Sequence, residues 1–222
     1  METESRAGRI IGILILVQMV GGPIVEFVLE APLFGTPGFL VNAASHPQQI
    51  GLAALLGLAI MATWVGMAIT AFPVFRQRVP TLALWFLALS VAILAAGVAE
   101  YTAMMSMVSA SEAYAKASPA QREQLETIRV LVAAARNWPH FMVRIVAGAT
   151  IFVFYAALYR SALVPRALAA FGMIAAVLMA TSLAMPFFGG EVVFPMLAPL
   201  GLCQLILAVW LVMKGFRHQG AE

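Results

Sequence analysis

Six long apolar stretches constrain this chain more than any other feature of its sequence. A helix needs about 20 mainly apolar residues to cross the hydrocarbon core of a bilayer, and six windows reach that length. They cover approximately residues 10–30, 50–74, 80–108, 139–160, 166–187 and 195–215. Only 10% of the residues are charged, against about a quarter in soluble domains. We therefore predict an all-α membrane protein, a bundle of six transmembrane helices that forms a single transmembrane domain over residues 1–222.

Basic residues at the ends of these windows set the predicted orientation. Eight arginines and lysines fall on one side of the membrane when consecutive helices alternate in direction. They are Arg6, Arg9, Arg76, Arg78, Arg160, Arg166, Lys214 and Arg217. Because loops rich in lysine and arginine stay in the cytoplasm, both termini are predicted to be cytoplasmic. Orientation and contact with anionic lipid headgroups account for the formal net charge of +3, which does not indicate nucleic-acid binding.

A polar segment between the third and fourth windows predicts a further helix. In "SPAQREQL", Ser118 suits the N-cap position, Pro119 the first helical position and Gln121 the third, which completes a capping box. Apolar residues then recur at helical spacing. We expect an amphipathic helix over approximately residues 118–136 that lies on the outer membrane surface or roofs the bundle. Pro139 is expected to separate it from the fourth spanning helix, because the residue before a proline disfavours helical dihedral angles.

Three segments carry a resemblance to a known family. They are the hairpin "YRSALVPRALAAFGMIAA", the ending "QLILAVWLVMKGF" and the start "RAGRIIGILILV". Together they resemble the bacterial integral-membrane family catalogued as domain of unknown function 4386. The resemblance covers nearly the whole chain and implies a multi-pass protein of the bacterial cytoplasmic (inner) membrane. It implies no activity, but members often have an acidic residue late in the first helix and a histidine early in the fourth, where Glu26 and His140 lie.

Ionisable residues within the predicted spans indicate a candidate site, because such side chains are costly in a membrane and mark a function or an internal pair. At about 1.5 Å per residue, Glu26 lies roughly 24 Å along the first helix and Glu100 roughly 30 Å along the third. His140 begins the inward-running fourth helix, and Arg144 lies about 6 Å deeper. The four residues share the outer third of the bilayer. We expect the stripe of His140 and Arg144 to face Glu100 and Glu26 inside the bundle.

Two interpretations of this layer stay open. In one, Arg144 simply holds Glu100 or Glu26 in a structural pair. In the other, the residues line a titratable cavity: one arginine does not balance two carboxylates, so a glutamate is protonated, His140 is charged or a cation binds. A zinc-like ion held by Glu26, Glu100 and His140 is a further alternative, although Arg144 would repel it. No particular metal or cofactor is identified.

Four more residues are candidate accessory groups. Glu30 is expected to pair with Arg136 at the membrane interface. Tyr101 and Trp138 suit interface anchors or the wall of a ligand pocket. Glu191 follows a Gly-Gly pair that lets it fold over the same cavity.

The residue inventory excludes several membrane enzymes. The chain has no aspartate, so it is not an aspartyl intramembrane protease, and its two lysines lie outside the spans, which excludes a retinal Schiff base. Three histidines are too few for a multi-histidine desaturase. We predict a binder or carrier of a small ligand, ion or lipid headgroup, surrounded by the lipid bilayer, with a homodimer among the expected assemblies. The alternatives are an enzyme on a lipid-like substrate, with His140 as general base and Glu100 orienting it, and a structural assembly subunit.

Overall fold

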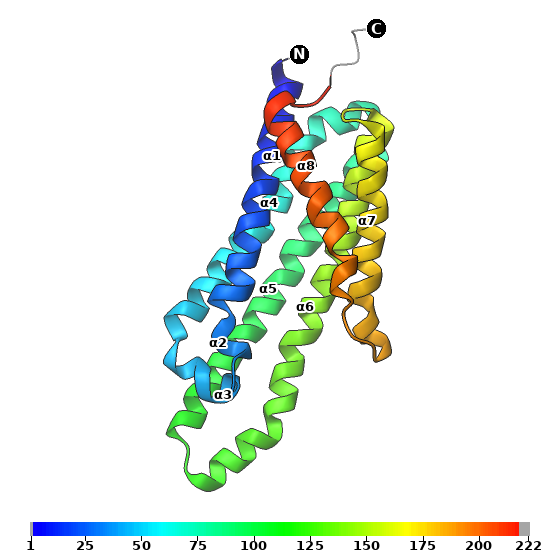
Figure 1. Cartoon of the computed structure of the whole chain (residues 1–222). Helices are drawn as coiled ribbons and strands as arrows, with labels where there is room; N and C mark the ends of the chain where they lie inside the picture. Colours follow the sequence, from blue (N-terminus) through cyan, green and yellow to red (C-terminus); the bar gives the residue numbers. More distant parts are fainter. Residues whose placement is uncertain (1, 218–222) are drawn as a thin grey trace. The chain divides into compact units, whose positions relative to one another are not determined.

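The elements of the chain are helices joined by short connections. A computed structural model describes the backbone of residues 2–217 and the side chains of residues 4–217, and within this range every regular element is helical (Figure 1). The long helices are α1 (Glu2–Pro23), α4 (Pro47–Arg78), α5 (Pro80–Lys116), α6 (Pro119–Ser161), α7 (Arg166–Ala184) and α8 (Ala198–Lys214). The short elements are the π-helix η1 (Ile24–Leu29), α2 (Ala31–Phe34), α3 (Phe39–Asn42), and the 3₁₀-helices η2 (Ala43–Ser45), η3 (Met185–Phe188) and η4 (Phe194–Met196).

Within the described residues, six helical segments are long and apolar enough to cross a membrane. They are Glu4–Leu29, Pro47–Arg78, Pro80–Lys116, Pro119–Ser161, Arg166–Phe188 and Phe194–Lys214. They contain the cores of the six predicted windows, so the prediction of six apolar spans is confirmed. The chain has the fold of a multi-pass membrane protein. The cytoplasmic location of the termini and the amphipathic outer helix stay predictions.

Helix α6 corrects the predicted boundary at Pro139. The helix runs without a break from Pro119 to Ser161 with Pro139 inside it, so the predicted separation is wrong. A proline removes one backbone hydrogen bond and crowds the carbonyl four residues earlier. Neighbouring groups in a membrane protein can compensate for this loss, so a proline does not have to end a spanning helix. The start of α6 agrees with the predicted cap: the backbone N–H and the hydroxyl of Ser118 both donate to Gln121 Oε1, at 2.9 and 3.0 Å.

Contacts along the chain divide it into two units. Unit 1 comprises the described parts of Met1–Met19, Ala62–Leu94 and Val143–Glu222, and unit 2 comprises Val20–Met61 and Ala95–Met142.

Unit 1 is built around an aromatic core. The ring centroid of Phe75 in α4 lies 6.3 Å from that of Phe86 and 6.2 Å from that of Phe154. The rings of Phe86 and Phe154 stack with their centroids 5.1 Å apart. Phe216, which follows α8, lies 6.2 Å from Phe75. Gly12 allows α1 to approach α8 closely, because a Cβ atom there would lie 2.9 Å from a backbone oxygen of α8 (Figure 1). Small residues at such crossings are typical of membrane helix packing.

Unit 2 ties its short connecting elements to the long helices. The buried hydroxyl of Ser111 in α5 accepts a hydrogen bond from the Ala44 N–H and donates one to the Leu40 carbonyl, both at 2.8 Å. Gly57 of α4 makes room for Tyr101 of α5, because a Cβ atom on Gly57 would lie 1.9 Å from the tyrosine hydroxyl. These contacts join α5 to the α3–η2 segment and to α4.

Candidate functional site

Three elements of unit 2 bring five ionisable side chains together. The π-helix η1 carries Glu26, and Glu30 is its C-cap. Helix α5 contributes Glu100, and α6 contributes Arg136 and His140. We call this set the ionisable cluster. Every member lies within unit 2, so its geometry can be described as one site.

Arg136 lies between two buried carboxylates. Its Nη2 atom donates a 2.5 Å hydrogen bond to Glu30 Oε2 and lies 3.6 Å from Glu100 Oε1. The side chains of Arg136, Glu30 and Glu100 are only 5%, 3% and 3% exposed. The guanidinium also lies over the Phe34 ring, 4.8 Å from its centroid. Because a buried charge without a partner is strongly destabilising, this arginine is an integral part of the packing of unit 2.

His140 has a carboxylate at each of its two ring nitrogens. Nδ1 lies 2.7 Å from Glu100 Oε1, and Nε2 lies 3.5 Å from Glu26 Oε1. A neutral imidazole carries one N–H and leaves a lone pair on the other nitrogen. If both glutamates were ionised, that lone pair would face a negatively charged oxygen. A protonated imidazole would instead donate to both carboxylates.

Glu26 in η1 and Glu30 at its C-cap owe their positions to an unusual backbone. Residues Ile24–Leu29 form a π-helix, a rare element that occurs mostly as single turns and frequently at functional sites. The N–H of Glu30 donates to the Val25 carbonyl at 2.9 Å, the bond that closes this wide turn. The side chain of Gln49 donates to two further carbonyls near the end of η1, at 3.0 and 3.3 Å. Glu26 is 33% exposed, so it is the most accessible carboxylate of the cluster.

The structure brings together part of the predicted set. The expected proximity of Glu26, Glu100 and His140 is confirmed by the contacts of the imidazole. The pairing of Glu30 with Arg136 is also confirmed, and sequence reasoning missed that Arg136 is buried and reaches Glu100. The four-residue spacing of Arg136 and His140 was the available signal. Arg144 lies one helical turn beyond His140 in unit 1, and its role in the cluster stays a prediction.

The other predicted accessory residues occupy different environments. Tyr101 is buried against Gly57. Trp138 is 47% exposed, and its ring lies 6.5 Å from that of Phe141. Glu191 is exposed between η3 and η4 in unit 1. Their roles at a ligand site stay predictions.

The ionisable cluster is not arranged as a metal site. Among the described residues, no group of three or more histidine, cysteine, aspartate or glutamate side chains could hold a metal ion. Glu26 and Glu100 face different nitrogens of His140, so the three side chains do not converge on a common point. The zinc-like alternative therefore has no ligand set here.

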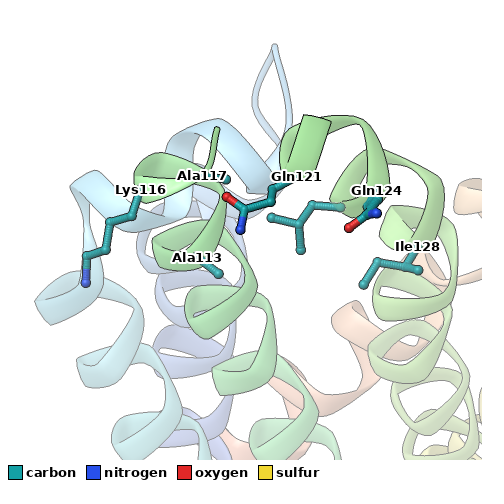
Figure 2. A pocket seen from close by; sticks show the side chains of 7 residues that line it. Ala113, Lys116, Ala117, Gln121, Gln124 and Ile128 are labelled. Carbon is teal, nitrogen blue, oxygen red and sulfur yellow. The ribbon is translucent and has the colours of Figure 1, made fainter. Parts of the chain in front are cut away.

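A pocket of about 490 Å³ lies elsewhere in unit 2, where α5 ends and α6 begins (Figure 2). Its lining residues are Ala113, Lys116, Ala117, Gln121, Gln124, Leu125 and Ile128. Figure 2 shows Lys116 on the α5 side, and the amides of Gln121 and Gln124 on the α6 side. Ile128 precedes His140 by roughly 18 Å of helix, so this pocket is separate from the cluster.

Comparisons with known proteins place the chain in a family without adding an activity. The family described as domain of unknown function (DUF4386) matches residues 10–215. No curated protein and no solved structure matches the chain.

Proposed function

The chain belongs to the DUF4386 family, and we propose that it is a bacterial inner-membrane protein that binds or carries a small ligand, ion or lipid headgroup through proton exchange at the ionisable cluster. The family description assigns no activity, so the proposal rests on the cluster itself. Histidine and glutamate side chains that face one another in a membrane protein are typical of proton relays and ion pathways.

The observation that carries the proposal is the position of His140 between two carboxylates. Its ring nitrogens lie 2.7 Å from a Glu100 oxygen and 3.5 Å from a Glu26 oxygen. One contact places the imidazole against a buried glutamate, and the other places it against a glutamate that is 33% exposed. A proton taken up at Glu26 can therefore pass to His140 by a rotation of one side chain, without a change in the fold.

The charges favour a cationic ligand over an anionic one. The cluster contains three carboxylates, one guanidinium and one imidazole. Arg136 contacts Glu30 and Glu100. We assign the exchange to Glu26 and His140, because Glu26 is the most exposed of the three carboxylates and contacts the imidazole. A cation or a cationic headgroup that approaches Glu26 replaces the proton there, because both stabilise the same negative charge. Binding and proton release are then linked.

The first test asks whether a molecule stays bound to the purified protein. Native mass spectrometry of the full chain in detergent would compare wild type with Glu26→Gln and His140→Ala. Matched controls are Glu126→Gln, which removes an exposed carboxylate of α6, and His46→Ala, which removes an exposed histidine. We expect a bound species in wild type and both controls, and its loss in the two cluster variants. A species that survives in the cluster variants would contradict the proposed site.

The second test measures proton release directly. Sodium, ammonium and choline chlorides would each be added to weakly buffered protein that contains a pH-sensitive dye. We expect at least one of these probes to release about one proton per bound cation from wild type, by exchange at Glu26 and His140. Glu26→Gln should abolish the release, and Glu126→Gln should preserve it. Release that is unchanged in Glu26→Gln would refute proton exchange at this cluster.

One contact favours the enzyme alternative. The 2.7 Å contact between His140 and Glu100 has the geometry of a general base oriented by a carboxylate. The other nitrogen, however, faces Glu26, where a general base would face its substrate. Hydrolysis of a lipid-like ester that is lost in His140→Ala and retained in Glu26→Gln would favour the enzyme. Variants that change only thermal stability would favour the structural role.

A further inference from the structure

The last helix of unit 1 carries an apolar groove on its exposed face. A groove of about 350 Å³ follows α8 and is lined by Leu205, Ile206, Val209, Trp210, Met213 and Lys214. The aliphatic side chains of this stripe are well exposed, from 45% for Leu205 to 69% for Met213. The stripe extends roughly 13 Å along the helix. Its length and apolar character suit part of a single acyl chain.

Two cations close one end of the groove. Lys214 Nζ lies 4.4 Å and Arg217 Cζ lies 5.1 Å from the centroid of the Trp210 ring. The N–H of Arg217 donates to the Leu163 carbonyl at 2.8 Å, which holds the segment after α8 in place. Among the side chains of residues 4–217, neither cation has a carboxylate within ion-pair distance. Within that part of the chain, no carboxylate neutralises the two positive charges at the end of the apolar stripe.

We propose that this surface binds one anionic phospholipid, with its phosphate on Lys214 and Arg217 and an acyl chain along the α8 groove. Basic side chains at the end of a spanning helix recognise anionic lipid headgroups, and an aromatic ring at that level anchors at the membrane interface. A free phosphate would use only the two cations. The exposed apolar stripe that begins beside them is the reason to assign a lipid. This site is separate from the ionisable cluster and does not depend on the proposed function.

The expected effect follows from the two charges. Each lysine or arginine near an anionic membrane surface contributes about 1 kcal/mol of attraction. Two of them correspond to a preference of roughly 30-fold for an anionic over a zwitterionic phospholipid of the same chain length, since about 1.4 kcal/mol is a factor of ten. Removing both cations should abolish most of this preference.

The test is native mass spectrometry of the detergent-purified full chain with added lipid. Equal concentrations of phosphatidylglycerol and phosphatidylcholine with identical acyl chains would be offered to wild type and to the double variant Lys214→Ala/Arg217→Ala. The control Lys116→Ala/Arg122→Ala removes two cations of unit 2, near the turn between α5 and α6. We expect wild type and the control to retain phosphatidylglycerol preferentially, and the double variant to bind the two lipids alike. An unchanged preference in the double variant would overturn the proposal.

Two further arms separate the headgroup from the tail. Millimolar inorganic phosphate should not displace long-chain phosphatidylglycerol, and a short-chain phosphatidylglycerol should bind at least several-fold more weakly. If phosphate competes fully, or if chain length has no effect, the site is an anion site without a lipid groove and the proposal fails.

A fluorescence measurement keeps the proposal testable if the double variant does not fold. Phosphatidylglycerol with brominated acyl chains would be added to wild type and to Trp210→Phe, and the quenching of tryptophan emission compared. The difference in emission between wild type and Trp210→Phe is the emission of Trp210. We expect brominated phosphatidylglycerol to quench this Trp210 emission more than brominated phosphatidylcholine does. Equal quenching by the two lipids would contradict headgroup recognition beside Trp210.

Discussion

Replacing Arg136 with glutamine tests whether the buried ion network holds unit 2 together. The guanidinium is 5% exposed and faces the carboxylates of Glu30 and Glu100, which are each 3% exposed. Arg136→Gln removes the guanidinium from both buried carboxylates. Breaking a buried ion pair by removing one partner costs about 3–5 kcal/mol. The matched control is Arg129→Gln on the same helix, because its pair with Glu126 has side chains 49% and 47% exposed.

The assay is thermal unfolding of each purified variant in the same detergent. For a chain of this length, 1 kcal/mol corresponds to about 2–4 °C in Tm, so we expect Arg136→Gln to lower the Tm by about 10 °C. Arg129→Gln removes an exposed pair that contributes about 0.5 kcal/mol at most, so its Tm should fall by roughly 1–2 °C.

The double variant Glu30→Gln/Arg136→Gln separates charge burial from loss of packing. It replaces a charged pair with two amides that can hydrogen-bond to each other, so it should recover part of the Tm lost in Arg136→Gln. The reasoning would be refuted if Arg136→Gln lowered the Tm no more than Arg129→Gln does. A double variant that is less stable than Arg136→Gln would show that Glu30 contributes something other than its charge.

Three other substitutions follow from specific contacts, each measured as a change in Tm. Gly57→Ala should lower the Tm strongly, because the added Cβ would lie 1.9 Å from the hydroxyl of Tyr101. The control Gly51→Ala adds a Cβ with no atom within 4 Å, so it should leave the Tm unchanged or raise it. Equal changes in Tm for the two variants would contradict this packing. Ser111→Ala should lower the free energy of unfolding by about 1–3 kcal/mol, because it leaves two backbone groups of the α3–η2 segment without their 2.8 Å hydrogen bonds. An unchanged Tm would argue against a stabilising role for these two bonds. Gln121→Ala removes the acceptor of the two Ser118 hydrogen bonds at the start of α6 and should cost about 1 kcal/mol, with faster amide exchange in the first turn as the diagnostic.

The sequence predicted the features of the fold that depend on local composition. Apolar length alone indicates six spans, because a bilayer core requires about 20 apolar residues in each helix. The cap at Ser118 was also predictable, because a capping box is local and its residues are three positions apart. Helix direction and rise per residue sufficed to place Glu26, Glu100 and His140 in one layer, and they are in contact.

Only the tertiary structure decided how the members of the cluster pair. Arg136 and Arg144 lie on one stripe of α6, two turns apart, and the sequence does not say which guanidinium meets Glu100. That choice depends on helix rotation and on packing around Pro139, which the sequence suggested as a break but which α6 accommodates. The π-helix that carries Glu26 has no sequence signature either. The positions of the ionisable groups along the sequence therefore determined that they share a layer of this membrane protein. Long-range packing between η1, α5 and α6 decided that His140 lies between two carboxylates. The reason is that a shift of a few ångströms in helix placement changes which side chains meet, and no local sequence pattern encodes that placement.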